Sequence, residues 1–344
     1  MGSLLLQEIS DKIDSISPST QYWFIRTNGG VYFDEFVRNG FIAIGYNSIT
    51  INDVKYSKTQ PNPFKNLSDK VKFFFPNEKR PGYIANQIFD FVYNIKKDDI
   101  VLIPSTHSDK IAIGTILESA TYDEIESQYE SKSSCKYNKR KRVKFLKIIP
   151  KHKLEPNLFK IIFIHRALTR IEPDVAKSID RTTNTLFVKG EKAHFVVRIE
   201  SQKDLNALNV FSSFLEIFEL ADEFGKSENI IIDTKKVAFK SNLNSPGTVE
   251  LIGLVETITI IALIAVFLVG ANFEIGGKLL FNMKIQSDGI LKRVSQFMAE
   301  YRHQQTIKIL NSKLKGMDLK EEDIIGLLSQ FSDKDDKEDK NPTT

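Results

Sequence analysis

The chain has 344 residues, of which 41% are hydrophobic, and its formal net charge is +4. This length allows two or three domains, each with enough apolar residues for a core of its own. The single cysteine, Cys135, excludes an intrachain disulfide, and no secretory signal pattern opens the sequence, so we expect a cytoplasmic protein.

Strand and helix patterns alternate through the first part of the chain. Apolar residues spaced three and four apart predict an amphipathic helix over residues 83–95, and two short apolar runs after it predict strands joined by a polar loop. Alternating polar and apolar residues over 142–148 predict a half-buried strand that ends the first domain near Pro150. The earlier strands are expected at 21–27, 41–46, 100–103 and 111–116.

The order of these elements carries a family resemblance. It rests on the Tyr22-Trp23 pair of the opening strand, the helix 83–91, the Asp98-Asp99 turn, the polar loop 105–108 and the Ile113-Gly114 pair of the returning strand. In this order the features resemble the EVE branch of the PUA-like superfamily, over about residues 20–150. The resemblance implies that residues 1–150 form a small β-barrel with packed helices. It implies a sensor that binds nucleic acid, DNA in preference to RNA and a modified base in particular, in prokaryotic restriction or antiviral defence.

A base-binding pocket would follow from this resemblance. Such a pocket needs a flat aromatic wall for stacking and fixed polar groups for the edge of the base. The expected pocket residues are Trp23, Arg26, Tyr46, Tyr83, Asn86, Ser105, Thr106 and His107. Tyr32 and Phe33 are further candidates for the wall. For each aromatic ring taken alone, burial in a core is the competing interpretation.

A dense basic cluster leads into the expected closing strand. The expected phosphate-binding residues are Lys136, Lys139, Arg140, Lys141 and Arg142. Closely spaced cations attract phosphate and release counterions on binding, and an aromatic ring among them could stack on a base. The alternative interpretation is a solvated loop, which most charge runs are.

Residues 151–331 are expected to form a second domain, and the predicted fold class of both domains is α+β. Strand patterns at 194–199 and 248–252 flank an amphipathic helix over 204–224. No motif in this part indicates a reaction, so we expect an effector or oligomerisation domain whose partner is a second copy of the chain or a separate effector protein. Residues 332–344 lack apolar anchors and predict a disordered charged tail.

The most apolar segment is 251–273, within which the residues from Thr257 to Ala271 carry no charge. A membrane span needs about 20 apolar residues, and shorter runs more often form buried helices. A strand-like segment over 276–285 follows, and its sheet partners would lie before the apolar run. A very apolar helix buried in the second domain is therefore favoured. The alternative is a single-pass inner-membrane anchor, which would make the protein a membrane-bound effector.

Catalytic motifs are sparse. Asp233 and Lys235 match the acid-x-Lys half of a metal-dependent nuclease core, in which carboxylates hold Mg²⁺ and the lysine stabilises charge. A turn before Val237 explains the same residues more simply. The histidines show no metal-ligand spacing and no Gly-rich phosphate loop is present, so we expect neither a metal nor a cofactor. A binding protein is favoured over an enzyme, with a modification-dependent nuclease as the alternative.

Overall fold

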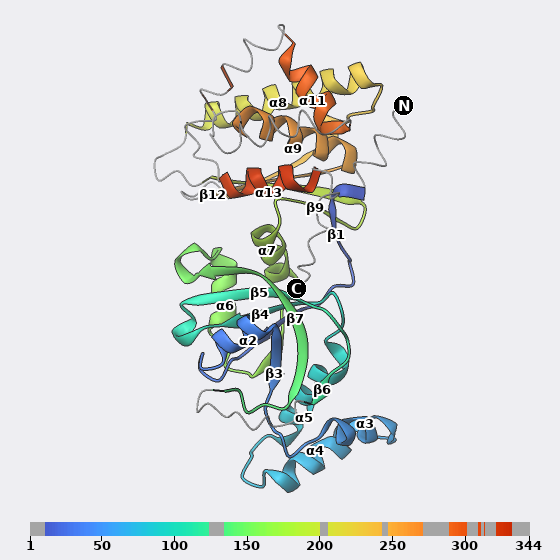
Figure 1. Cartoon of the computed structure of the whole chain (residues 1–344), viewed down its shortest axis with the longest axis vertical. Helices are drawn as coiled ribbons and strands as arrows, with labels where there is room; N and C mark the ends of the chain where they lie inside the picture. Colours follow the sequence, from blue (N-terminus) through green and yellow to red (C-terminus); the bar gives the residue numbers. More distant parts are fainter. Residues whose placement is uncertain are drawn as a thin grey trace, which may run out of the picture. The chain divides into compact units, whose positions relative to one another are not determined.

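The chain folds into two compact units, shown in Figure 1. The computed structural model describes residues 11–123, 134–199, 206–242, 247–270, 289–300, 309–310, 313 and 321–331. The central unit is Ser19–Thr183, and the terminal unit combines Met1–Pro18 with Asn184–Thr344. The central unit therefore extends past the boundary expected at Pro150, and the first residues of the chain belong with its C-terminal part.

The central unit is built on one mixed sheet. Its strands are β2 (Tyr22–Ile25), β3 (Phe41–Ile44), β4 (Ile100–Pro104), β5 (Lys110–Ile116), β6 (Tyr122–Asp123), β7 (Lys139–Pro150) and β8 (Leu168–Arg170). Their order is β3-β7-β5-β4-β2-β8, with β6 paired to β7, and only β2 and β4 are parallel. The sheet curls into a half-barrel. Its end strands, β3 and β8, are not paired with each other. The α+β class is confirmed, whereas the expected barrel is an open half-barrel.

Successive residues of β2 point to opposite faces of this sheet, as strand geometry requires. Trp23 and Ile25 join one apolar cluster with residues of α2 (Phe33–Asn39) and β3. Tyr22 and Phe24 join a second cluster on the other face. After η3 (Lys151–Lys153), that second face is covered by Leu154, η4 (Pro156–Leu158), α6 (Phe159–Ile162) and α7 (Pro173–Thr183). Because these segments complete the core of the sheet, the unit ends at Thr183.

Three helices form a smaller core beside the sheet. They are α3 (Ile51–Thr59), α4 (Pro63–Phe74) and α5 (Pro81–Phe89), and α5 continues as a π-helical turn, η1 (Asp90–Asn94). Their shared core contains Val54, Leu67, Val71 and Ile88. Figure 1 shows α3 and α4 lying beyond the edge of the sheet, next to α5. The helix expected over 83–95 is thus present as α5 and η1.

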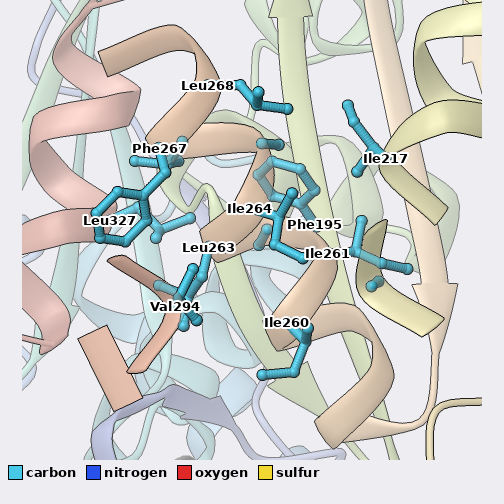
Figure 2. Packing of buried hydrophobic residues seen from close by; sticks show 14 of the residues in the cluster. Phe195, Ile217, Ile260, Ile261, Leu263, Ile264, Phe267, Leu268, Val294 and Leu327 are labelled. Carbon is cyan, nitrogen blue, oxygen red and sulfur yellow. The ribbon is translucent and has the colours of Figure 1, made fainter. Parts of the chain in front are cut away.

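The terminal unit contains a second sheet with helices packed on it. Its strands are β1 (Asp14–Ile16), β9 (Leu186–Lys189), β10 (Lys192–Ile199), β11 (Ala238–Asn242) and β12 (Gly247–Gly253), in the order β1-β9-β10-β12-β11. Its helices are α8 (Ala207–Glu228), η5 (Thr234–Lys236), α9 (Val255–Gly270), α11 (Ile290–Ala299) and α13 (Glu321–Phe331). Figure 2 shows the core around α9, where side chains of α8, β10, α11 and α13 surround Ile261, Leu263 and Ile264.

The apolar segment 251–273 is not one continuous helix. Its first residues end strand β12, which pairs with β10 and β11, and α9 begins at Val255 and has 16 residues. Within the part of the chain that the structure describes, no helix combines the length and the apolar character needed to cross a membrane. Residues 271–273, the strand expected over 276–285 and the charged tail 332–344 lie outside the described residues.

Candidate functional site

Trp23, the first residue of the expected pocket, lies in the core and not on an accessible wall. Its side chain is 3% exposed, and its indole Nε1 donates a hydrogen bond to Asp99 Oδ2 at 2.9 Å. The same buried carboxylate accepts hydrogen bonds from the backbone N–H groups of Gln21 and Lys96, each at 2.9 Å. A base could stack on Trp23 only if core side chains moved away, so the competing interpretation as a core residue describes its position.

Arg26, another expected pocket residue, links the residue after β2 to the end of α6 and to Ile164. Its Nε donates to the carbonyl oxygen of Ile164 at 2.7 Å, and its Nη2 donates to that of Ile162 at 2.8 Å. Burial lowers the pKa of this guanidinium from its usual value. The donors of Arg26 that would read a base therefore bind backbone carbonyls instead.

The polar loop between β4 and β5 is packed against the loop that precedes α2. Ser105 Oγ accepts a hydrogen bond from the backbone N–H of Lys110 at 2.9 Å, which closes the polar loop. A Cβ atom on Gly30 would lie 2.1 Å from the backbone nitrogen of Thr106, so only glycine allows this approach. Thr106 and His107 are exposed, and His107 has a φ of 53°. The two loops thus lie against each other, and the polar loop carries three expected pocket residues, Ser105, Thr106 and His107.

Tyr46 and Tyr137 come together where β3 and β7 meet. The antiparallel register pairs Ile44 with Lys139, and the same register carried two residues further places Tyr46 opposite Tyr137. Consistently, a Cβ atom on Gly45 would lie 3.0 Å from the Tyr137 ring. Both tyrosines are half-buried. No local pattern shows this pair, because the two residues are far apart in the chain and only the pairing of β3 with β7 joins them.

We call four neighbouring tyrosines the tyrosine band: Tyr32, Tyr46, Tyr83 and Tyr137. The rings of Tyr32 and Tyr137 meet edge to face with 5.1 Å between their centroids. The pKa of Tyr137 is raised by burial and by the neighbouring Tyr32 and Tyr46. Burial also raises the pKa of Tyr46, with smaller contributions from Glu78 and Tyr83. With these raised pKa values, the hydroxyl groups of Tyr46 and Tyr137 stay protonated at neutral pH, as hydrogen-bond donors.

The loop that carries Tyr137 is held by side chains from the other side of the band. Asn47 Nδ2 donates to the carbonyl oxygen of Lys136 at 2.6 Å, and Asn47 Oδ1 accepts from the backbone N–H of Asn138 at 3.3 Å. The backbone N–H of Cys135 donates to Glu35 Oε2 at 2.6 Å. Lys136 itself is exposed beside these contacts. The loop before β7 is thus held by Asn47, which follows β3, and by Glu35 on α2.

Helix α5 places Tyr83 in the band and Asn86 on the surface. Gln87 Oε1 accepts a hydrogen bond from the backbone N–H of Leu168 at 3.0 Å, which docks the helix on β8. The exposed guanidinium of Arg166 lies over the Tyr83 ring, 5.0 Å from its centroid. The attraction between a cation and an aromatic face is favourable. In this position the outer side of the Arg166 guanidinium can still contact an anion.

The prediction of phosphate binding is wrong for Lys139 and Lys141, because both side chains are fully buried at 0% exposure. Lys139 Nζ donates to the carbonyl oxygens of Tyr46 and Ile49, each at 3.0 Å, and Lys141 Nζ donates to the carbonyl oxygen of Ser119. The reason is that the strand β7 begins at Lys139, so alternate residues point into the core. These two lysines are structural.

The remaining cations of the cluster differ in their surroundings. Arg140 is half-buried and donates to the carbonyl oxygens of Tyr137 and Cys135, at 3.0 and 2.9 Å. Arg142 is exposed and lies 3.3 Å from Glu118. Of the five expected phosphate ligands, Lys136 and Arg142 are therefore the two that are exposed to solvent.

The burial of Lys141 predicts a dependence of stability on pH. Burial lowers the pKa of this amine from 10.5 to about 8, against a smaller opposing effect of Asp99. Between these values the unfolded chain binds the proton that the folded chain has released. The free energy of unfolding is therefore expected to rise with pH across this window, by at most about 1.4 kcal/mol per pH unit.

Lys141→Met is the matched control for this prediction, because it keeps the length of the side chain without a titrating group. Urea unfolding of both proteins between pH 7 and about pH 10.5 gives the difference that matters, since other groups, such as the Cys135 thiol with its pKa raised to about 11, titrate in both. Parallel stability curves for the two proteins would contradict the expected role of Lys141.

The nuclease residues Asp233 and Lys235 lie in the terminal unit on a short turn, η5, as the simpler interpretation predicted. Asp233 Oδ2 pairs with Lys236 Nζ at 2.9 Å, and this contact lowers the pKa of the carboxyl group. Lys235 is exposed. Among the described residues, no group of three or more His, Cys, Asp or Glu side chains is placed to hold a metal ion.

Comparison with known proteins reaches the central unit alone. A family model described as a domain of unknown function (DUF8426) matches residues 24–172, which is less than half of the chain. No curated protein matches the chain. No solved structure matches it either. The matched range continues past residue 150, as the central unit does.

Proposed function

We propose that the central unit binds nucleic acid, DNA in preference to RNA, and that the tyrosine band contacts an unpaired base. The observation that carries this proposal is the half-buried group of Tyr46, Tyr83 and Tyr137 beside the exposed cations Lys136 and Arg166. Partly exposed rings that are held rigidly can stack on a base, and nearby cations attract its phosphate.

The resemblance to the EVE branch supports the same proposal from the sequence. It makes a modified base the preferred ligand and a sensor in prokaryotic defence the biological setting. The polar loop 105–108 adjoins the loop that leads to Tyr32, so its exposed hydroxyl and imidazole groups would meet the edge of a base stacked on the band. In this proposal the terminal unit serves as the effector or oligomerisation module.

The double substitution Tyr46→Ala with Tyr83→Ala tests this proposal. Stacking contributes about 1–3 kcal/mol per base, so the affinity for an oligonucleotide is expected to fall roughly five- to 150-fold. Fluorescence anisotropy with DNA oligonucleotides, plain and methylated, measures the effect. Phe159→Ala is the control, because this half-buried ring packs on the other face of the sheet.

Two results would reject the proposed function. One is a native chain that binds no oligonucleotide, plain or methylated, as single strand or duplex. The other is a loss of affinity no larger for the double variant than for Phe159→Ala. Thermal melting of both variants ensures that folded proteins are compared.

A further inference from the structure

The helices α3 and α4 expose large aromatic side chains to solvent. The rings are Tyr56, Phe64, Phe73 and Phe74, and Phe73 is 79% exposed. Rings of this size are costly to leave in water, and exposed rings gathered on two neighbouring helices mark a candidate interaction surface. We call these rings, together with the cations of residues 51–80, the hairpin surface.

The hairpin surface stands on a well-ordered base. Thr50 and Asp53 form a reciprocal cap at the start of α3, and Lys70 on α4 forms an ion pair with Asp53. Ser57 Oγ donates to Asn66 Oδ1 at 2.7 Å, which ties the two helices together again. Leu67 and Val71 fill the core below. These contacts therefore fix α3 and α4, which carry the exposed rings, against each other.

The charge on this surface is positive. Its cations are Lys55, Lys58, Lys65, Lys72, Lys79 and Arg80, in addition to Lys70. The acidic residues of the same range are Asp53, Asp69 and Glu78, so cations exceed anions by four. Lys70 forms an ion pair with Asp53. The net positive charge of this range fits a polyanion.

Two ring contacts join the region of α4 to the tyrosine band and to α5. The ring of Phe75, the residue after α4, meets Tyr46 edge to face with 5.5 Å between centroids. The Phe64 ring on α4 packs against Phe89 at the end of α5, with 4.8 Å between centroids. Helix α5 also carries Tyr83. A strand bound at the band would therefore continue onto the hairpin.

We propose that the hairpin surface binds the unpaired DNA strand next to the base held by the tyrosine band. This inference rests on the proposed function. Within a duplex the faces of the bases are stacked on one another, so exposed rings gain contact only with unpaired bases. Rings interleaved with lysines provide stacking platforms and phosphate contacts at once. The preferred substrate is thus DNA with a single-stranded segment.

Two variants separate stacking from charge. Phe73→Ala with Phe74→Ala removes two rings, and we expect its affinity for a single-stranded oligonucleotide to fall roughly five- to 150-fold per stacked base. Its affinity for a blunt duplex should stay within about twofold. Replacing Lys55, Lys65 and Lys72 by Ala should flatten the dependence of log affinity on log salt by about 0.7 for each lost contact with a single strand.

The matched controls lie elsewhere on the central unit. Phe163→Ala removes a ring that is 70% exposed, and a triple substitution of the exposed Lys144, Lys153 and Lys160 removes the same charge. Both controls should bind like the native chain. Fluorescence anisotropy measures binding to single-stranded and duplex DNA of one sequence. Flotation with vesicles of phosphatidylserine and phosphatidylcholine measures binding to an anionic membrane.

The outcomes distinguish the two proposals. If the native chain binds no DNA, the proposed function fails and this inference fails with it. If the native chain binds DNA and only the band variant loses affinity, the hairpin inference alone is overturned. Equal losses on single strand and duplex overturn the assignment to an unpaired strand. Vesicle binding that the hairpin variants abolish, with DNA binding unchanged, assigns the surface to a membrane instead.

Discussion

Trp23→Ala is expected to lower the free energy of unfolding by about 3–5 kcal/mol, the usual cost of truncating a large buried aromatic ring. The ring is buried in the core of the central unit, and the loss of its N–H removes one donor from the buried Asp99 carboxylate. Because Trp23 is the only tryptophan, circular dichroism in urea is the suitable measurement.

Trp23→Phe separates the two contributions, because it keeps most of the packing and removes only the hydrogen bond. Its cost should be nearer to 1–3 kcal/mol, which is roughly the penalty of leaving a buried polar group without its donor. Folded Trp23→Phe should bind oligonucleotides like the native chain. A variant with unchanged stability but lost preference between plain and methylated DNA would place the indole on an accessible wall.

Lys139→Ala is expected to destabilise the central unit by roughly 3 kcal/mol or more. The reason is that Lys139 Nζ donates to two carbonyl oxygens, and leaving a buried acceptor without its donor costs about 1–3 kcal/mol. One of these carbonyls belongs to Tyr46, which has a φ of 60°, so the band should loosen as well. Urea unfolding measures the loss of stability, and anisotropy measures the loss of affinity that follows.

Lys144→Ala is the matched control, because it lies on the same strand with its side chain exposed. Its effect on stability should stay within about 0.5 kcal/mol, as for most surface substitutions. Equal stability of Lys139→Ala and Lys144→Ala, with a weaker salt dependence of DNA binding for Lys139→Ala, would restore Lys139 as a phosphate ligand.

The early elements of the central unit could be predicted from local periodicity. The strands expected at 41–46, 100–103 and 111–116 are present as β3, β4 and β5. The strand expected at 142–148 begins earlier, at Lys139. Apolar alternation cannot mark that start, because the inward positions at 139 and 141 hold lysines whose amines bind backbone carbonyls. For this reason the sequence alone predicts the whole basic cluster as an exposed phosphate-binding surface.

The candidate site depended on contacts between distant parts of the chain. Tyr83 and Tyr46 were expected in a pocket from the resemblance, but their neighbour Tyr137 joins them only through the pairing of β3 with β7. Trp23 has the residue type of a stacking wall, and its position on β2 decides that it faces the core. The domain boundary was misplaced for a similar reason, because residues 154–179 cover a sheet face formed much earlier in the chain.

The pairing of β1 with β9 has a consequence for synthesis of the protein on the ribosome. In the sequence, the whole of Ser19–Thr183 separates these two parallel strands. When β1 leaves the ribosome its partner has not yet been translated, whereas the central unit can be completed from residues already made. We therefore expect β1 to wait without a partner until β9 appears. A translational pause or a misfolding event within the central unit would prolong that wait and leave an unpaired strand open to aggregation.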